Sequence, residues 1–322
     1  MVTASTPSPD HLRLLVKVAR MYHERGLRQP EIAERLNMSQ ARVSRLLKEA
    51  ADRAVVRTVV VSPEGVHAEL EDALIKEYGL RDAVVADAGG AGTDVIPALA
   101  AATATYLDAT LKGGDVIGIS SWSATLLEAV NVMPAKTNSV AHEVVQIVGG
   151  SGSPEVQLHA TRLTSRLAEL TGARPVFAPC AALVHSRELR DLLSKEPDVA
   201  EVMQSWARLT LALVGIGTLE PSPLLRRSGN AITPQDKRQL EELGAVGDVC
   251  TRYFDAEGRP VNADFDDRII GIEPDQLRAV DRRIGVAGGE SKVAAIRGAA
   301  RGGWINILIT DADTAKALLK NP

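Results

Sequence analysis

Several polar side chains between Gln40 and Lys48 have the types and the spacing that recognition of DNA bases requires. Gln40 begins a segment in which Arg45 and Lys48 recur on one side at helical spacing, opposite an apolar stripe. Glutamine can bond bidentately to adenine and arginine to guanine, while lysine neutralises phosphate. The sequence therefore predicts a DNA-contacting face made of Gln40, Ala41, Arg42, Ser44, Arg45 and Lys48.

Two short helices within residues 29–53 are predicted to carry this face. Ser39 stands where the second helix begins, and its hydroxyl can accept a bond from one of the unpaired backbone N–H groups there. The apolar stripe of that helix consists of Val43, Leu46, Leu47 and Ala50. A helical hairpin with a solvated basic face is the alternative. Stripe, cap and turn together favour a helix-turn-helix, in which the start of the second helix meets base edges. An earlier helix is predicted over residues 12–26.

Charge is distributed unevenly along the 322 residues. Residues 1–60 hold 11 Lys+Arg and 6 Asp+Glu, a net of +5, and the remainder holds 26 and 35, a net of −9, which gives −4 for the chain. Phosphate contacts supply much of the affinity for DNA, and the basic end of the chain coincides with the predicted DNA reader. The acidic remainder would be repelled by DNA and is expected to serve another purpose.

Composition indicates a two-domain cytoplasmic protein without a metal site or a cofactor. Hydrophobic residues make up 45% of the chain, enough for a sizeable core, yet no run approaches the ~20 apolar residues that span a bilayer. The first residues lack the basic and apolar segments of a secretory signal. Cys180 and Cys250 lie too far apart to suggest a disulfide framework or a zinc ribbon, and the six histidines form no HxH or HxxxH pair.

The predicted organisation is a disordered lead at 1–10, a winged-helix-like domain at 11–61, a linker at 62–66 and an α/β domain at 67–322. A β-rich run over 54–62 would form the wing or the crossing into the next domain. Candidate strands of the α/β domain lie at 82–87, 115–120, 143–150, 174–179, 209–217, 268–272, 282–289 and 304–311. Candidate helices lie at 67–80, before the first strand, and then at 95–112, 122–132, 157–170, 187–193, 234–243, 291–300 and 313–319. Continuous apolar strands separated by helices predict a mostly parallel sheet covered on both faces.

Several of these strands end in glycine or serine, as in GISS (118–121), VGGSG (148–152), VGIG (214–217) and VAGGE (286–290). In open α/β sheets, ligands bind beyond the carboxyl ends of the strands, and glycine lets backbone N–H groups approach an anion there. The sequence therefore predicts a ligand site at this edge of the sheet.

Over nearly its whole length the chain resembles the SorC/DeoR-type sugar-binding bacterial transcriptional regulators. The resembling segments are QPEIAERLNMSQARVSRLLKEA (29–50), VIGISSWSATL (116–126), VQIVGG (145–150), LVGIG (213–217), AVGDVCTRYFDAEGRPV (245–261), DDRIIGI (266–272), VAGGESKVAAIRGA (286–299) and INILITDADTAKALL (305–319). The resemblance implies an effector domain similar in fold to sugar-phosphate isomerases and glucosamine-phosphate deaminases. It also implies a regulator of carbohydrate or polyol catabolism that binds operator DNA as a homodimer or homotetramer, under the control of a sugar, polyol or sugar phosphate.

The resemblance further implies positions for the effector. A loop that reads Trp-Gly-Arg/Lys-Thr in relatives, where it helps to hold phosphate, reads Trp-Ser-Ala-Thr over residues 122–125. Because the glycine and the cation are both absent, an unphosphorylated sugar or polyol becomes an alternative. Lys292 matches a lysine near the anion, Asp267 an acidic position that meets sugar hydroxyls, and His159 a polar contact of some relatives. The predicted effector-binding set is Ser120, Ser121, Ser123, Thr125, Gly149, Gly150, His159, Asp267 and Lys292.

Each of these assignments has a structural alternative. Lys292 could be a solvated surface lysine, Asp267 could form a salt bridge to Arg268, and a lone histidine is more often structural. Arg252 could reach the anion or merely solvate a strand. Val148, in VQIVGG, cannot form a Schiff base, so a covalent aldehyde adduct at that position is excluded.

Three other functions compete with that of a regulator. An isomerase or deaminase would need a positioned acid–base pair, and Asp248, Asp266, Asp267 and Glu290 form no recognisable pair, so no catalytic residue is predicted. A dinucleotide-binding oxidoreductase is suggested by GGAGTD (89–94), but the third glycine of the fingerprint is replaced by Val95. A nucleoid-type DNA binder would not need several Gly/Ser-rich strand ends on one edge of a sheet.

Overall fold

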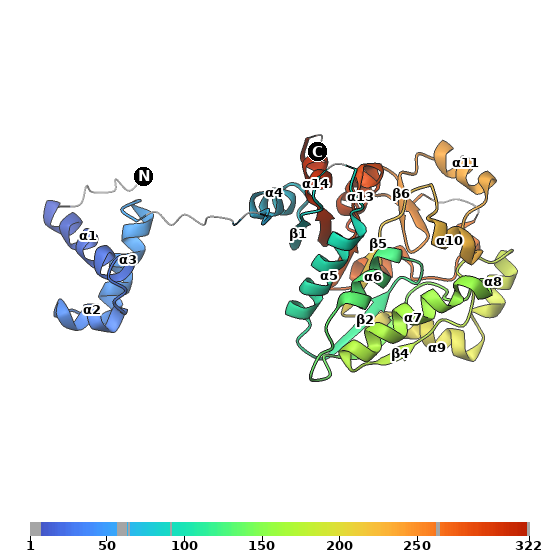
Figure 1. Cartoon of the computed structure of the whole chain (residues 1–322), viewed down its shortest axis with the longest axis horizontal. Coiled ribbons are helices and arrows are strands. Elements are labelled where there is room, and N and C mark those ends of the chain that lie inside the picture. The colour runs from blue at the N-terminus through green and yellow to red at the C-terminus, as the bar shows by residue number, and fades with distance from the viewer. Residues whose placement is uncertain (1–7, 57–62, 64, 91, 262–264, 321–322) are drawn as a thin grey trace. The chain divides into compact units, whose positions relative to one another are not determined.

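The computed structural model describes residues 8–56, 63, 65–90, 92–261 and 265–320. The chain divides into an N-terminal unit, residues 1–62, and a larger unit, residues 63–322 (Figure 1). Within the described ranges, no helix is both long enough and apolar enough to cross a membrane.

The N-terminal unit contains three helices, α1 (Pro9–His23), α2 (Gln29–Arg35) and α3 (Gln40–Asp52). The first begins earlier than predicted, because Ser8 and Pro9 start a helix where a disordered lead was expected. The Ser8 hydroxyl accepts a bond from the His11 backbone N–H at 3.3 Å, and proline suits the first helical position because its missing N–H would be unpaired there.

A small apolar core holds the three helices together. Its buried members are Leu15, Val18, Ala19, Met21, Ile32, Ala33, Val43, Leu46 and Ala50. The predicted stripe of the third helix thus points inward, with Leu47 partly buried beside it. Of the β-rich run predicted over 54–62, residues 54–56 form a turn and the rest lies outside the described residues, as do residues 62 and 64 of the predicted linker.

The larger unit is built on a seven-stranded sheet in the order β1-β9-β8-β5-β2-β3-β4, in which every pairing is parallel. Its strands are β1 (Asp82–Ala86), β2 (Asp115–Ile119), β3 (Ala141–Gln146), β4 (Arg174–Val176), β5 (Leu211–Gly215), β8 (Arg282–Val286) and β9 (Ile307–Asp311). The helices are α4 (Ala68–Tyr78), α5 (Ile96–Thr110), α6 (Ala124–Val132), α7 (Pro154–Thr171), α8 (Arg187–Leu193), α9 (Pro197–Ser205), α10 (Pro223–Ser228), α11 (Pro234–Glu242), α12 (Pro274–Ala279), α13 (Val293–Arg301) and α14 (Ala312–Lys320).

Helices cover both faces of the sheet, as the continuous apolar strands predict. One core contains residues of α5, α6 and α7, and the other contains residues of α4, α9, α13 and α14. Successive strand residues alternate between the cores, so that Leu211 and Leu213 enter one and Ala212 and Val214 the other. The predicted parallel α/β sheet is confirmed.

Two parts of the predicted layout differ from the structure. The strand expected over 268–272 does not join the sheet, since Asp266–Arg268 form a short 3-10 helix and only isolated bridges follow, at Ile269 and Gly271. A separate antiparallel hairpin, β6 (Gly247–Val249) and β7 (Arg252–Phe254), was not predicted. The helices α9, α10 and α12 were not predicted either.

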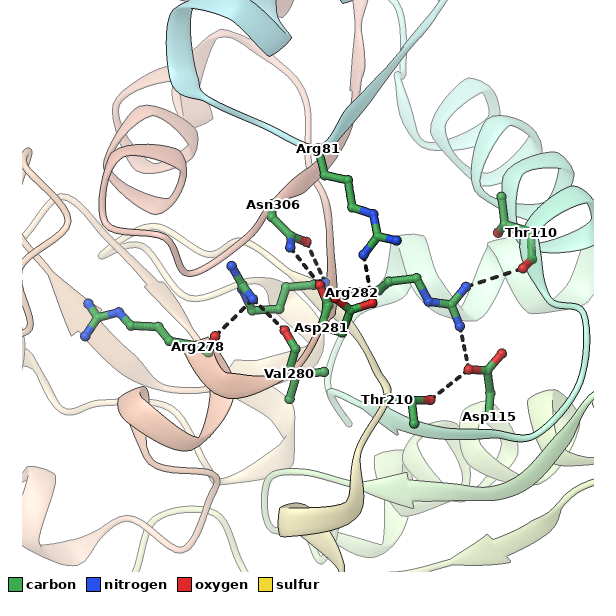
Figure 2. A network of polar contacts seen from close by, with 10 residues as sticks. Arg81, Thr110, Asp115, Thr210, Arg278, Val280, Asp281, Arg282 and Asn306 are labelled. Carbon is green, nitrogen blue, oxygen red and sulfur yellow. Dashed lines mark hydrogen bonds and ion pairs between the residues drawn. The ribbon is translucent and has the colours of Figure 1, made fainter.

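A polar network ties the strands together at the amino-terminal edge of the sheet (Figure 2). The Arg282 guanidinium on β8 pairs with the buried carboxylate of Asp115 on β2, which also accepts a bond from the Thr210 hydroxyl at 2.7 Å. Arg282 donates a further bond to the Thr110 carbonyl at the end of α5. Because this network lies at the strand edge away from the loops expected to hold a ligand, we assign it to stability.

Candidate functional site

The third helix presents its polar side chains to solvent. All six predicted DNA-contacting residues, Gln40, Ala41, Arg42, Ser44, Arg45 and Lys48, are exposed. Among the described residues none of the three cations forms an ion pair with a carboxylate, and Arg45 donates one bond to the Ala41 carbonyl at 3.3 Å. The face is therefore free to meet an anionic partner.

The orientation of this helix is fixed by its cap and by a bond to the first helix. The Ser39 hydroxyl accepts from the Arg42 backbone N–H at 3.3 Å, as the sequence predicts. Asn37, in the turn before it, has a φ of 48°, a conformation that asparagine adopts more readily than most residues. The Glu49 carboxylate lies 2.9 Å from His11 Nε2 on α1 and 2.7 Å from Arg53 Nε.

A second candidate site lies at the carboxyl edge of the sheet, where the strand order reverses. From β2 the chain builds outward to β3 and β4, and from β5 it builds the other way through β8. Ligands bind at such switch points because the loops diverge there. A cavity of about 460 Å³ opens at this point and is called the switch-point cavity below.

Leu99 of α5, Val148 after β3 and Leu225 of α10 line the switch-point cavity together with five segments. The five segments are Thr93–Ile96 before α5, Ser120 and Trp122–Thr125 after β2, Gly215–Thr218 and Glu220–Pro223 after β5, Asp248 with Cys250 and Thr251 in the hairpin, and Ala287–Gly289 with Lys292 after β8. They come from strands β1, β2, β5 and β8 and from the β6–β7 hairpin, so the fold gathers segments that are distant in sequence.

Hydrogen bonds fix the loop after β2 to the segment after β3 and to β5. The Ser121 hydroxyl donates to the Val148 carbonyl at 3.1 Å, and the Trp122 indole N–H donates to the Gly149 carbonyl at 3.2 Å. Ser120 is buried, and its hydroxyl accepts a bond from the Gly215 backbone N–H at 3.3 Å. These bonds hold the loop over the end of β3.

The β6–β7 hairpin reaches the cavity through a strained turn. Cys250 and Thr251 form its two central residues, with φ values of 54° and 62°. Both positions of such a turn favour glycine or asparagine, because a side chain is crowded there. The hairpin is held to the sheet by reciprocal backbone bonds between Asp248 and Gly217 at 2.9 and 3.2 Å. A Cβ at Gly217 would overlap the Asp248 carboxylate.

The carboxylate of Asp248 is buried within this arrangement. Its Oδ2 accepts a bond from the Thr251 backbone N–H at 3.0 Å. Burial raises the pKa of Asp248 to about 6, against the opposing effects of that N–H and of the Lys292 charge. The group is therefore mostly ionised at neutral pH and holds a desolvated negative charge against the cavity.

Lys292 supplies the positive charge of the cavity. It is half-buried, at the end of a 3-10 turn, Glu290–Lys292, and its ammonium donates to the Ile216 carbonyl at 2.8 Å. Burial lowers the pKa of Lys292, and the negative charge of Asp248 opposes that change. The two groups thus face the same cavity with opposite charge.

The structure brings together some of the predicted effector residues but not all. Ser120, Ser123, Thr125 and Lys292 line the switch-point cavity. Ser121, Gly149 and Gly150 do not, because they are buried behind the loop after β2. A Cβ at Gly149 would overlap the backbone of residues 181–182, and one at Gly150 would overlap the Gln146 side chain, so these glycines serve close packing.

Two further predicted residues lie outside the cavity lining. His159 is exposed on α7. Asp267 is exposed too, and its carboxylate lies 3.3 Å from Arg187 rather than forming the salt bridge to Arg268 that the sequence offered as an alternative. Arg252 is buried and pairs with Glu273 at 2.8 Å, also outside this lining.

Sequence reasoning missed the hairpin residues Asp248, Cys250 and Thr251, together with Asp94 and Glu220 at the cavity. The family resemblance over 245–261 marked this segment, but it did not predict that the segment would lie at the cavity. Its turn carries no glycine or asparagine, so the usual hairpin signature is absent.

Comparisons with known proteins match both units of the chain. Residues 64–320 match a family described as "Putative sugar-binding domain", and residues 11–65 match a helix-turn-helix domain family. The chain is 33% identical over 315 residues to the deoxyribonucleoside regulator of Bacillus subtilis, which covers 96% of this chain and 98% of the relative. It is 32% identical over 316 residues to the sorbitol operon regulator of Klebsiella pneumoniae, covering 97% and 99% of the two chains. The crystal structure of full-length SorC from Klebsiella pneumoniae superposes with a TM-score of 0.72 at 30% identity, over 96% of this chain and 99% of that one.

Proposed function

This chain belongs to the SorC/DeoR-type sugar-binding transcriptional regulators, and we propose that it controls carbohydrate or polyol genes by binding operator DNA through α3 under the control of an effector in the switch-point cavity. The observation that carries the proposal is an exposed polar helix face joined, in one chain, to a separate cavity at a sheet switch point. The relatives named deoxyribonucleoside regulator and sorbitol operon regulator support an effector of the carbohydrate class.

The proposed DNA contacts divide into base reading and phosphate binding. Gln40 and Arg45, near the start of α3, are assigned to base edges, and Lys48, one turn further on, to phosphate. Arg45→Ala should cost about 1–3 kcal/mol at the operator and relax specificity at one base pair. Lys48→Ala should weaken operator and random DNA alike and reduce the salt slope by about 1.

Fluorescence anisotropy with operator and random duplexes, at several salt concentrations, separates these contributions. Each variant serves as the other's control, since both residues are exposed on the same helix. An equal loss of operator and random DNA affinity in Arg45→Ala would show that Arg45 reads no base.

The effector is proposed to act by shifting an equilibrium between arrangements of the protein that differ in operator affinity. A ligand that binds one arrangement more tightly favours it, and linkage then requires operator DNA to change the effector's affinity by the same factor. Effector affinity measured by calorimetry with and without operator tests this. Identical effector affinities in the two conditions, for a compound that changes operator binding, would violate linkage and exclude the mechanism.

We further propose that the cavity binds its ligand without converting it. Burial raises the pKa of the Cys250 thiol, which disfavours a thiolate nucleophile, and Asp248 lies opposite a lysine rather than beside a second acid. The relatives are named as regulators, not as enzymes. Recovery of the bound compound unchanged, by mass spectrometry after prolonged incubation, is the expected result.

One helix-turn-helix contacts a short half-site, which leads us to propose a homodimer or homotetramer acting on pseudo-palindromic DNA in the cytoplasm. Light scattering on the full chain tests the assembly. A monomer that still binds its operator tightly would contradict it.

A further inference from the structure

The ionisable side chains that line the switch-point cavity carry more negative than positive charge. Asp94, Glu220 and Asp248 are lining carboxylates, and Lys292 is the one cation among the described lining residues. Glu220 is paired with Lys237, which lies outside the lining. A phosphate ester would add a charge of about −1.5 to −2 to a site that already holds an excess of carboxylates.

The starts of α5 and α6 at the cavity are capped by the protein's own side chains, whereas the 3-10 turn Glu290–Lys292 and α13 have no side-chain cap. Phosphate sites commonly use free N–H groups at such positions. Here the Ile96 N–H of α5 donates to Asp94 Oδ1 at 3.0 Å, and the Leu126 N–H of α6 donates to the Ser123 hydroxyl at 3.2 Å. In the loop after β8, the Gly289 N–H donates to Asp311 Oδ2 at 2.9 Å. An incoming phosphate would have to displace these partners.

The one lining cation is also engaged. The Lys292 ammonium donates to the Ile216 carbonyl, and its charge is opposed by the Asp248 carboxylate in the same cavity. An anion bound at Lys292 would therefore meet the field of Asp248 as well. Phosphate recognition usually depends on charge-assisted bonds from cations that are free to make them.

What the cavity does offer is a mixture of neutral donors and acceptors beside one carboxylate. Ser120 and Thr125 supply hydroxyl groups, while the Thr218 hydroxyl is already bonded to the backbone of Glu220. Among the described hydrogen bonds the Asp248 carboxylate takes part in one, through Oδ2, and none involves its Oδ1. The volume of about 460 Å³ falls within the range of small-molecule sites, about 300–1,000 Å³.

From these observations we infer that the effector is an uncharged polyol or sugar, not its phosphate ester. Its hydroxyls donate to Asp248 and accept from Lys292 and the lining hydroxyls. This inference rests on the proposed function, because it assigns the chemical class of the effector in the same cavity.

The test compares neutral compounds with their own monophosphates. Ribitol, D-glucitol, D-mannitol, D-ribose and D-glucose, each with the corresponding monophosphate, and inorganic phosphate are titrated into the full chain. Thermal shift detects binding to the folded state, calorimetry gives Kd, and anisotropy on operator DNA reports the response. The expected result is a neutral compound that binds saturably and alters operator affinity, with its monophosphate bound at least about tenfold more weakly.

A monophosphate that binds more tightly than its parent would overturn the inference and leave the proposed function standing. Stabilisation by inorganic phosphate that disappears in Lys292→Met would overturn it equally. If no compound of either series binds at millimolar concentration, the carbohydrate-controlled function fails together with the inference.

Asp248→Asn supplies a second readout. Removing the carboxylate weakens the bond to a ligand hydroxyl and removes repulsion of phosphate. The Kd of the monophosphate divided by the Kd of its neutral parent should therefore fall by about tenfold or more. Glu290→Gln, a carboxylate outside the cavity lining, is the matched control and should leave the ratio unchanged. An unchanged ratio in Asp248→Asn would contradict the electrostatic basis of the inference.

Discussion

Replacing Asp248 by asparagine should stabilise the larger unit at neutral pH while weakening effector binding. Asp248 is buried, and burial raises its pKa from 3.8 to about 6. Asparagine has nearly the same size, and its side-chain oxygen can still accept the bond from the Thr251 N–H. The substitution therefore removes a charge and keeps the hydrogen bond that shapes the turn.

The sign and the size of the effect follow from the pKa difference between the folded and unfolded chains. A carboxyl with the higher pKa in the folded chain holds its proton more tightly there, so its ionisation destabilises the fold. The destabilisation is absent below pH 3.8 and complete above about pH 6. It amounts to about 1.5 kcal/mol at pH 5 and about 3 kcal/mol at pH 7. The attraction between Asp248 and Lys292 is already included in the pKa of about 6, so about 3 kcal/mol is the full electrostatic gain expected at pH 7.

Tryptophan fluorescence during urea unfolding isolates the relevant transition. The chain has three tryptophans, Trp122, Trp206 and Trp304, and all belong to the larger unit. The gap in unfolding free energy between Asp248→Asn and wild type should widen from pH 5 to pH 7. Glu290→Gln, at an exposed carboxylate, should shift stability by less than about 0.5 kcal/mol. If the unfolding free energies of Asp248→Asn and wild type changed in parallel with pH, or if the variant were less stable than wild type at pH 7, the reasoning would be refuted.

Two further substitutions test how the fold is held together. Arg282→Ala should destabilise the larger unit by about 3–5 kcal/mol, because it leaves the buried Asp115 carboxylate without its cation, whereas Arg81→Ala breaks an exposed ion pair and should cost less than about 1 kcal/mol. Comparable losses in urea titrations of the two variants would show that the Asp115 pair is not the source of stability. Ser39→Ala should cost the N-terminal unit about 1 kcal/mol through loss of the α3 cap. Ser44→Ala, within the exposed face of the same helix, is the control, and thermal unfolding of both variants is followed by circular dichroism. An equal loss of stability in the two variants would show that the Ser39 cap does not stabilise the helix.

The parts of the fold that sequence could predict are those fixed by local pattern. Apolar runs such as 115–120 and 304–311 could only be buried strands, and the helices between them forced a parallel sheet. The cap at Ser39 and the stripe through Val43 and Leu46 likewise determined both faces of α3. The strand predicted over 268–272 was wrong because a short apolar segment is equally compatible with burial outside a sheet. It packs against Val148 and Leu183 through single bridges.

The candidate site was only partly predictable, because its residues meet through long-range pairing. Ser120 and Lys292 follow strands of the sheet, so the rule for carboxyl ends placed them correctly. Backbone bonds to Gly217 hold Asp248 at the cavity, and no local sequence pattern predicts this pairing. Asp267 stands just before the run 268–272, which does not form the predicted strand, and it lies in a 3-10 helix outside the cavity lining.

The hairpin tip at the cavity is also where the sequence departs furthest from what its local structure prefers. Cys250 and Thr251 occupy left-handed positions that glycine or asparagine would fill without strain, each at a cost of roughly 1–3 kcal/mol. Asp248 beside them keeps a desolvated charge that asparagine would remove. At the serine and proline that start α1, by contrast, local preference and fold agree. Single substitutions could relieve these costs without altering the sheet, and their concentration against one cavity supports our proposal that a ligand uses the carboxylate and the shape of the turn.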